Sequence, residues 1–138
     1  METVSVLEEL LVQLRPELDA GRYAFVTLPA GSTVDPALVV ASIREREGLS
    51  LIVPEQLALA RGWPVAFTAA WITLTVHSDL AAVGLTAAVS QALARAGISC
   101  NMVAGVRHDH LFVPVGQAQT AMETLQALSR TSARSQCR

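Results

Sequence analysis

The chain has 138 residues, a net charge of −2 at pH 7 and 51% hydrophobic residues. This length fits one domain of ordinary size or two very small ones, and the high hydrophobic fraction with little net charge excludes intrinsic disorder. Charged residues interrupt the most apolar stretches well before 18 residues, so no membrane-spanning helix is predicted.

The ten basic residues are all arginines, which excludes a Schiff-base lysine, a pyridoxal-phosphate lysine and a P-loop lysine. The arginines are scattered, so nucleic acid is not an expected partner. Cys100 lies in an apolar run and is interpreted as a small buried residue, whereas Cys137 is an incidental thiol in the polar tail. The N-terminus carries acids rather than a basic region, so no signal peptide is predicted and a cytoplasmic protein is expected.

In the first half, helical spacing of apolar residues over 6–14 predicts an amphipathic helix, which Pro16 and Gly21 end. Strands are then predicted at residues 23–28, 38–43 and 49–53. The charged bend at residues 44–48 joins the last two strands as a hairpin. Pro54 opens a short helix over residues 55–60, and a boundary follows near residues 61–66.

In the second half, apolar and polar residues alternate over 71–76, which predicts a half-buried strand. Ser78 or Asp79 is predicted to cap a helix that ends near Ala96, with Gly97 as its C′ residue. The buried stripe of that helix is predicted at Ala82, Leu85, Val89, Ala92 and Ala96. Strands 98–106 and 111–115 flank a turn at 107–110, and the last predicted helix covers residues 116–129.

The second half therefore has the order β-α-β-β-α and lacks the last strand of a ferredoxin-like unit. The first half has no full crossover helix between its first two strands. We expect the two halves to complete each other, with residues 23–28 as the best candidate for the missing strand.

Residues 71–115 resemble an ACT domain, a small regulatory module that binds amino acids. The features that carry the resemblance are Asp79 and Gly84 in a loop after a strand, the Gly97-Ile98 pair and Asn101. The whole chain resembles small bacterial proteins with two ACT-like halves. The resemblance implies an α+β fold of two ferredoxin-like halves, with antiparallel sheets and helices on one face. The expected parts are residues 1–65, residues 66–130 and a loose polar tail over residues 131–138.

The resemblance also implies a homodimer that binds an amino acid and has no catalytic activity or cofactor. A helix N-terminus offers free N–H groups to a carboxylate, and Asp79 can pair with an ammonium group. Gly84 lets backbone approach the ligand, so Gly84→Val is expected to impair binding more than folding. The predicted ligand-binding residues are His77, Ser78, Asp79, Val83, Gly84, Leu85 and Asn101.

Three alternatives remain open at this point. In the first, no ligand binds: Ser78 and Asp79 serve only as helix caps, and the Asn101 side chain only satisfies hydrogen bonds at the edge of a strand. In the second, the protein is a homodimerisation module without a ligand. In the third, His77, His108 and His110 form the metal site of an enzyme, although the spacing of His108 and His110 is more typical of a polar turn.

Overall fold

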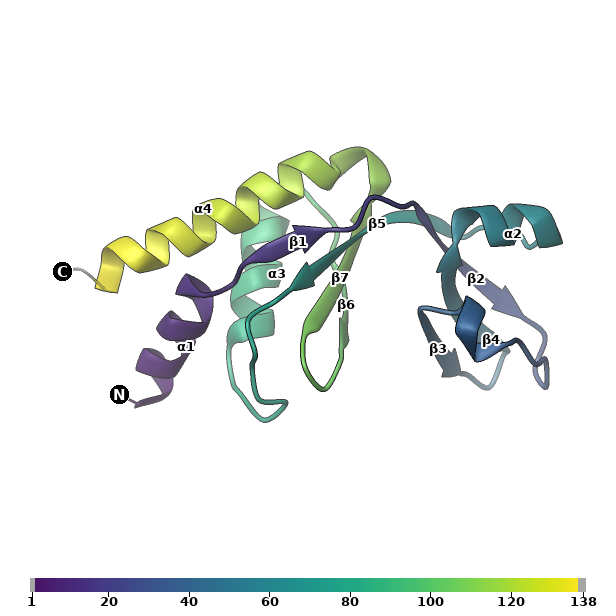
Figure 1. Cartoon of the computed structure of the whole chain (residues 1–138), viewed down its shortest axis with the longest axis horizontal. Coiled ribbons are helices and arrows are strands. Elements are labelled where there is room, and N and C mark those ends of the chain that lie inside the picture. The colour runs from purple at the N-terminus through teal and green to yellow at the C-terminus, as the bar shows by residue number, and fades with distance from the viewer. Residues whose placement is uncertain (1, 137–138) are drawn as a thin grey trace. The chain divides into compact units, whose positions relative to one another are not determined.

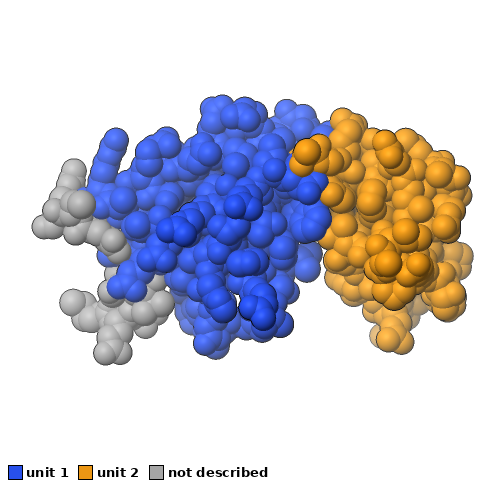
Figure 2. All heavy atoms as spheres, in the orientation of Figure 1, with its two compact units in different colours: residues 1–19, 71–138 blue, residues 20–70 orange. Residues whose placement is uncertain are grey.

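The computed structural model describes residues 2–136 and divides the chain into two compact units. Unit 1 comprises Met1–Asp19 and Trp71–Arg138, and unit 2 comprises Ala20–Ala70 (Figure 2). The sequence analysis expected a division between residues 65 and 66. The contacts instead place residues 1–19 with the second half of the chain, so one unit is assembled from two separate segments.

Unit 2 is a small antiparallel sheet with one short helix. Its strands are β2 (Tyr23–Leu28), β3 (Ala41–Arg44) and β4 (Leu49–Pro54), in the order β3-β4-β2, and β2 also pairs with residues 67–69 of β5 (Phe67–Leu74). The helix α2 (Glu55–Arg61) contacts β2 and β4 (Figure 1). The core combines alternate strand residues with one helix residue: Ala24, Val26, Leu51, Val53 and Ala58.

Unit 1 contains three helices and the remaining strands. Its N-terminal segment forms α1 (Glu2–Val12) and β1 (Pro16–Leu18). After β5 the chain forms α3 (Leu85–Arg95), β6 (Asn101–Ala104), β7 (Asp109–Pro114), a 3₁₀ turn η2 (Val115–Gln117) and α4 (Ala118–Gln136). Strand β1 pairs with β5, and the order continues β5-β7-β6.

The missing strand of the second half is β1. Glu17 lies opposite Thr73 in an antiparallel ladder, and Leu18 lies opposite Ile72. The prediction that residues 23–28 fill this position is wrong, because they pair with β5 only at residues 67–69, inside unit 2. β1 is not predicted from the sequence, because Pro16 indicates the end of a helix and a strand of three residues is too short to show periodicity.

The core of unit 1 lies between its helices and one face of its strands. Ile72 and Leu74 of β5 are fully buried, as are Leu111 and Val113 of β7. Further buried residues complete this layer: Leu11 of α1, Leu14 in the connection to β1, Leu85, Val89 and Leu93 from α3, and Ala121 and Leu125 from α4. The predicted stripe on α3 is therefore right at Leu85 and Val89, but Leu93 is buried and Ala96 is exposed.

One further boundary differs from the predicted one. Residues 131–136, expected to be a loose tail, continue α4, and Ser132 is nearly buried with its hydroxyl donating to the carbonyl of Leu128 at 2.9 Å. Cys137 lies outside the described residues. Within the described residues, no helix has the length and apolar character needed to cross a membrane.

Candidate functional site

The loop at residues 75–84 connects β5 to α3 and carries most of the predicted ligand-binding residues. Asp79 folds this loop on itself: its Oδ1 accepts a hydrogen bond from the backbone N–H of Ala81 at 2.9 Å, and its carbonyl accepts one from Ala82 at 2.9 Å. The prediction that Ser78 or Asp79 caps the helix is wrong, because α3 begins only at Leu85. Asp79 is exposed.

Helix α3 starts without a side-chain cap. Its N-cap residue is Gly84 at φ 103°, which has no side chain to accept a hydrogen bond. The first N–H groups of an α-helix have no partner within the helix, and they carry the positive end of the helix dipole. Leu85 follows with only 3% of its surface exposed. Its side chain belongs to the core, and its backbone N–H is one of these first groups of the helix.

Gly84 also contacts the N-terminal helix. A Cβ added at this position would lie 3.0 Å from Cδ2 of Leu7 in α1. A bulky residue here would strain a left-handed backbone and push Leu7 aside, so Gly84→Val would disturb packing as well as binding. The expectation that this substitution acts mainly on binding is therefore corrected.

The rest of the loop presents apolar and polar side chains to solvent. Leu80 is 63% exposed and Val83 is 71% exposed, which is unusual for large apolar residues in so short a segment. His77 is also exposed. Ser78 connects the loop to the β6–β7 turn, because its hydroxyl lies 3.4 Å from Oδ2 of Asp109.

Asn101 lies on β6 rather than beside this loop. The strand order places β7 between β5 and β6, and the side-chain amide of Asn101 lies 3.4 Å from the carbonyl of Phe112 on β7. The side chain is exposed. The described hydrogen bond thus joins Asn101 to its neighbouring strand, and its role toward a ligand stays a prediction.

A polar and aromatic cluster on β5 and β7 was missed by the sequence analysis. Trp71 donates its indole N–H to Nδ1 of His110 at 3.1 Å, and the hydroxyl of Thr73 lies 3.1 Å from the same nitrogen. The Trp71 ring stacks on Phe112, with ring centroids 5.9 Å apart. Alternation already predicted that Trp71 and Thr73 share one face of their strand, but the register between β5 and β7 could not be predicted from local patterns.

This cluster fixes the state of its histidine. An indole N–H only donates, so Nδ1 of His110 accepts and the neutral ring carries its proton on Nε2. Burial lowers the pKa of His110, the charge of His108 lowers it further, and Asp109 opposes both. Nearby, Nδ1 of His108 is buried without a hydrogen-bond partner in the described structure. The ring of His110 is therefore held neutral and oriented.

The histidines do not assemble a metal centre. Among the described residues, no group of three or more histidine, cysteine, aspartate or glutamate side chains is placed to hold a metal ion. The alternative in which His77, His108 and His110 bind a metal therefore has no geometric support. Cys100 is half-buried, and burial raises the pKa of its thiol, which favours the unreactive protonated form.

Two models of the ACT-domain family match the chain, one over residues 3–70 and the other over residues 67–127. The chain is also 41% identical to a Vibrio cholerae protein of solved structure, with a TM-score of 0.82, covering 92% of this chain and 98% of that one. The chain belongs to the ACT-domain family. The resemblance and the fold class inferred from the sequence, α+β with two ACT halves, are thereby confirmed.

More distant solved structures share the fold. The regulatory subunit of aspartate kinase from Thermus thermophilus has a TM-score of 0.61 at 13% identity, covering 82% of this chain and 95% of that one. A protein from Agrobacterium tumefaciens has a TM-score of 0.65 at 17% identity, covering 83% of this chain and 87% of that one. The Vibrio protein is described as of unknown function and as a possible transport protein. A comparison with curated proteins gives no match. Family membership supports a regulatory role of the ACT type.

Proposed function

We propose that this ACT protein is a non-catalytic regulator that binds a free amino acid at the loop between β5 and α3. The observation that carries the proposal is the start of α3 at Gly84 without a side-chain cap. The carboxylate of the ligand would accept hydrogen bonds from the N–H groups of Val83 to Leu85. The ammonium group would pair with the exposed carboxylate of Asp79, whose position the Ala81 hydrogen bond already fixes.

The surroundings of these two groups suit a zwitterion with an apolar side chain. Leu80 and Val83 are exposed beside the uncapped helix end and would lose apolar surface to water when a ligand covers them. His77 and Ser78 would contribute polar contacts at the opposite end of the loop. Asn101 lies on β6, across β7 from β5, and its contact with the ligand stays a prediction to be tested by substitution.

A screen of the twenty amino acids by thermal shift, followed by calorimetry, tests this proposal. Asp79→Ala should weaken the binding of a hit about tenfold to a hundredfold, because a hydrogen bond to a charged group contributes about 1.5–3 kcal/mol. Asn101→Ala tests the strand contribution and costs the fold at most one long hydrogen bond. Asp35→Ala is the matched control, since Asp35 makes the same kind of turn contact in unit 2, to the N–H of Ala37 at 3.0 Å.

Failure of the proposal would be unambiguous in this design. If no amino acid raises the melting temperature at millimolar concentration, the ligand class is wrong. If a hit binds equally well to wild type, Asp79→Ala and Asn101→Ala, its site lies elsewhere in the molecule, and the cluster around His108 and His110 becomes the next region to test.

We further propose that two copies of the chain form a homodimer along β6. In unit 1 the strand order ends at β6, whose second edge is left for another strand. A surface hollow of about 550 Å³ lies between α3 and the segment that leads into β6, lined by α3 residues such as Ala87 and Ala94 together with Cys100. Light scattering should give twice 14.6 kDa, and Ala94→Arg should shift the protein to the monomer. A wild-type monomer at micromolar concentration would remove this proposal.

A further inference from the structure

The two units share one order of elements along the chain, but one element is a helix in unit 1 and only a short turn in unit 2. Unit 1 runs β5, α3, β6, β7 and α4, and unit 2 runs β2, a 3₁₀ turn η1 (Pro36–Leu38), β3, β4 and α2. The neighbours in the sheets correspond as well, since β5-β7-β6 matches β2-β4-β3. The three-residue turn η1, which buries no residue, therefore stands where unit 1 has the 11-residue helix α3.

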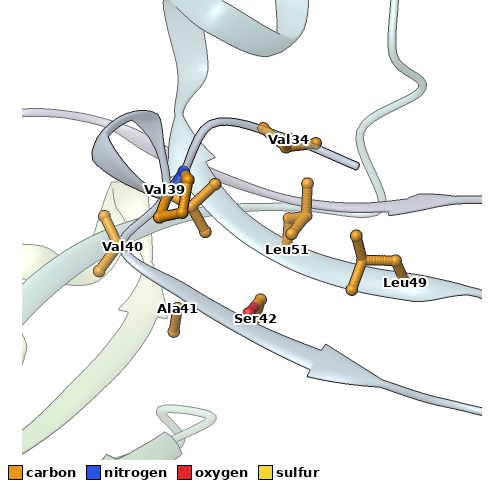
Figure 3. A pocket seen from close by; sticks show the side chains of 8 residues that line it. Val34, Val39, Val40, Ala41, Ser42, Leu49 and Leu51 are labelled. Atoms are coloured by element: carbon orange, nitrogen blue, oxygen red, sulfur yellow. The ribbon is translucent and has the colours of Figure 1, made fainter. Parts of the chain in front are cut away.

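A hollow is left where a full helix would cover the strands of unit 2. It has a volume of about 240 Å³ and lies between the η1 segment and strands β3 and β4. Figure 3 shows Leu49 and Leu51 extending from β4 toward the segment that carries Val34, with Val39 at the other side. We call this cavity the unit 2 hollow. Its walls are mainly aliphatic, as in pockets that hold the apolar part of a ligand.

A second cavity of about 700 Å³ continues from the unit 2 hollow, and we call it the polar cavity because its wall includes hydroxyl and charged residues beside apolar ones. The two cavities share Val34, Ser42 and Leu49 as lining residues. The register of β3 explains this continuity: Ser42 lies opposite Leu51 and Arg44 lies opposite Leu49, so these side chains follow one face of the sheet. The polar cavity is lined further by Ser32, Thr33, Arg44 and Glu45.

The charged residues of the polar cavity differ in how they are engaged. The hydroxyl of Ser50 donates to Oε1 of Glu45, and the backbone of Glu45 is held by the carbonyl of Gly48 at 2.9 Å. Arg44 is exposed and forms no ion pair within the described residues. A guanidinium binds a carboxylate through two parallel hydrogen bonds. The Glu45 carboxylate is engaged by Ser50, which alternates to the other face of β4 from Leu49 and Leu51, so Arg44 is the charged group available to a ligand on this face.

We propose that the unit 2 hollow and the adjoining polar cavity bind a small monocarboxylic acid with a compact branched apolar group. The carboxylate pairs with Arg44 and receives hydrogen bonds from the hydroxyls of Ser32 and Ser42. The branched group fills the space between Val39 and Leu51. This site is separate from the one proposed at the loop between β5 and α3, and it does not depend on that proposal.

Titration of the full-length protein with isovalerate, followed by calorimetry and amide chemical shifts, tests this site. Isovalerate should bind and shift the amides of residues 31–34 and 42–49. Succinate should not, because its second carboxylate would have to enter the aliphatic unit 2 hollow without a partner. Arg44→Gln should weaken isovalerate binding about tenfold to a hundredfold. Arg46→Gln is the matched control, because Arg46 lies in the same exposed turn and lines neither cavity.

A second variant tests the apolar part independently of charge. Ser42→Leu places a branched side chain in the space that the two cavities share and should abolish binding while the melting temperature is kept. The proposal is overturned if isovalerate does not bind at millimolar concentration, or if Arg44→Gln and Arg46→Gln have equal effects.

Discussion

At the scale of single residues, His110 couples the stability of unit 1 to pH. Its Nδ1 accepts the indole N–H of Trp71 at 3.1 Å and cannot accept once it is protonated. Burial lowers the pKa of His110 in the folded protein below its ordinary value of 6.5. Below that value the unfolded chain therefore binds more protons than the folded one, and the free energy of unfolding falls as the pH is lowered.

The expected result is a protein that is most stable above about pH 6.5 and loses stability as the pH falls through the lowered pKa of His110. Urea unfolding across this range measures the effect. His110→Phe keeps a ring on β7 but removes the titrating group, so its stability should depend less on pH than that of wild type. Parallel pH profiles for the two proteins would contradict the role assigned to His110.

At the scale of the elements, α3 depends on a glycine for its first turn. Gly84→Ala introduces a side chain at φ 103° and only 3.0 Å from a methyl group of Leu7. We expect the free energy of unfolding to drop by about 1–3 kcal/mol, because an L residue in this conformation is strained. Gly116→Ala is the control, since a Cβ there meets nothing within 4 Å. Equal stability of the two variants in chemical denaturation would refute this account.

The elements also show what the sequence can and cannot predict. The pattern of Tyr23–Leu28 predicted β2 with the bounds that the structure shows, and the hairpin of β3 and β4 followed from its charged turn. These signals are local. The pairing of β1 with β5 joins segments far apart in the chain, and no short-range pattern in Pro16–Leu18 records it. Likewise, the Asp79 carboxylate can accept a hydrogen bond from the first N–H groups of a helix or from its own turn, and the sequence does not distinguish the two. The start of α3 was therefore predicted too early in the chain.

The candidate site, too, was predictable where the signal is local and not where it depends on strand pairing. The sequence identified a loop with an acid and a glycine before a helix, and the structure places Asp79 and Gly84 in that loop. It could not show that Asn101 lies on β6 with β7 between it and β5. It also could not bring Trp71 to His110, since that contact depends on the register between two strands.

At the scale of the whole molecule, unit 1 needs both ends of the chain. A fragment of residues 66–138 lacks α1 and β1, and with them the buried Leu11 and Leu14. It also loses the hydrogen bond from the hydroxyl of Ser129 in α4 to the carbonyl of Val12, at 2.9 Å. We expect this fragment to be molten or poorly soluble, because it exposes a strand edge and an apolar face.

Adding a synthetic peptide of residues 1–19 should restore cooperative unfolding to that fragment, as measured by circular dichroism. A peptide with Leu14→Asp is the control and should not restore it, since Leu14 is fully buried in unit 1. Cooperative unfolding of the 66–138 fragment as a monomer without peptide would show that the N-terminal segment is dispensable.

The pairing of β1 with β5 brings together the two points at which the chain leaves unit 1 and returns to it. The N–H of Asp19 donates to the carbonyl of Trp71 at 2.9 Å, so the chain leaves unit 1 and returns to it at neighbouring points. Unit 2 is thus an inserted domain whose two ends are already held together, and the entropic cost of closing so long a loop grows only slowly with its length. A short hairpin turn joining residue 19 to residue 71 could replace it. We therefore expect unit 1 to keep its fold when residues 20–70 are replaced by such a turn, because the two strands that the turn would join are already paired.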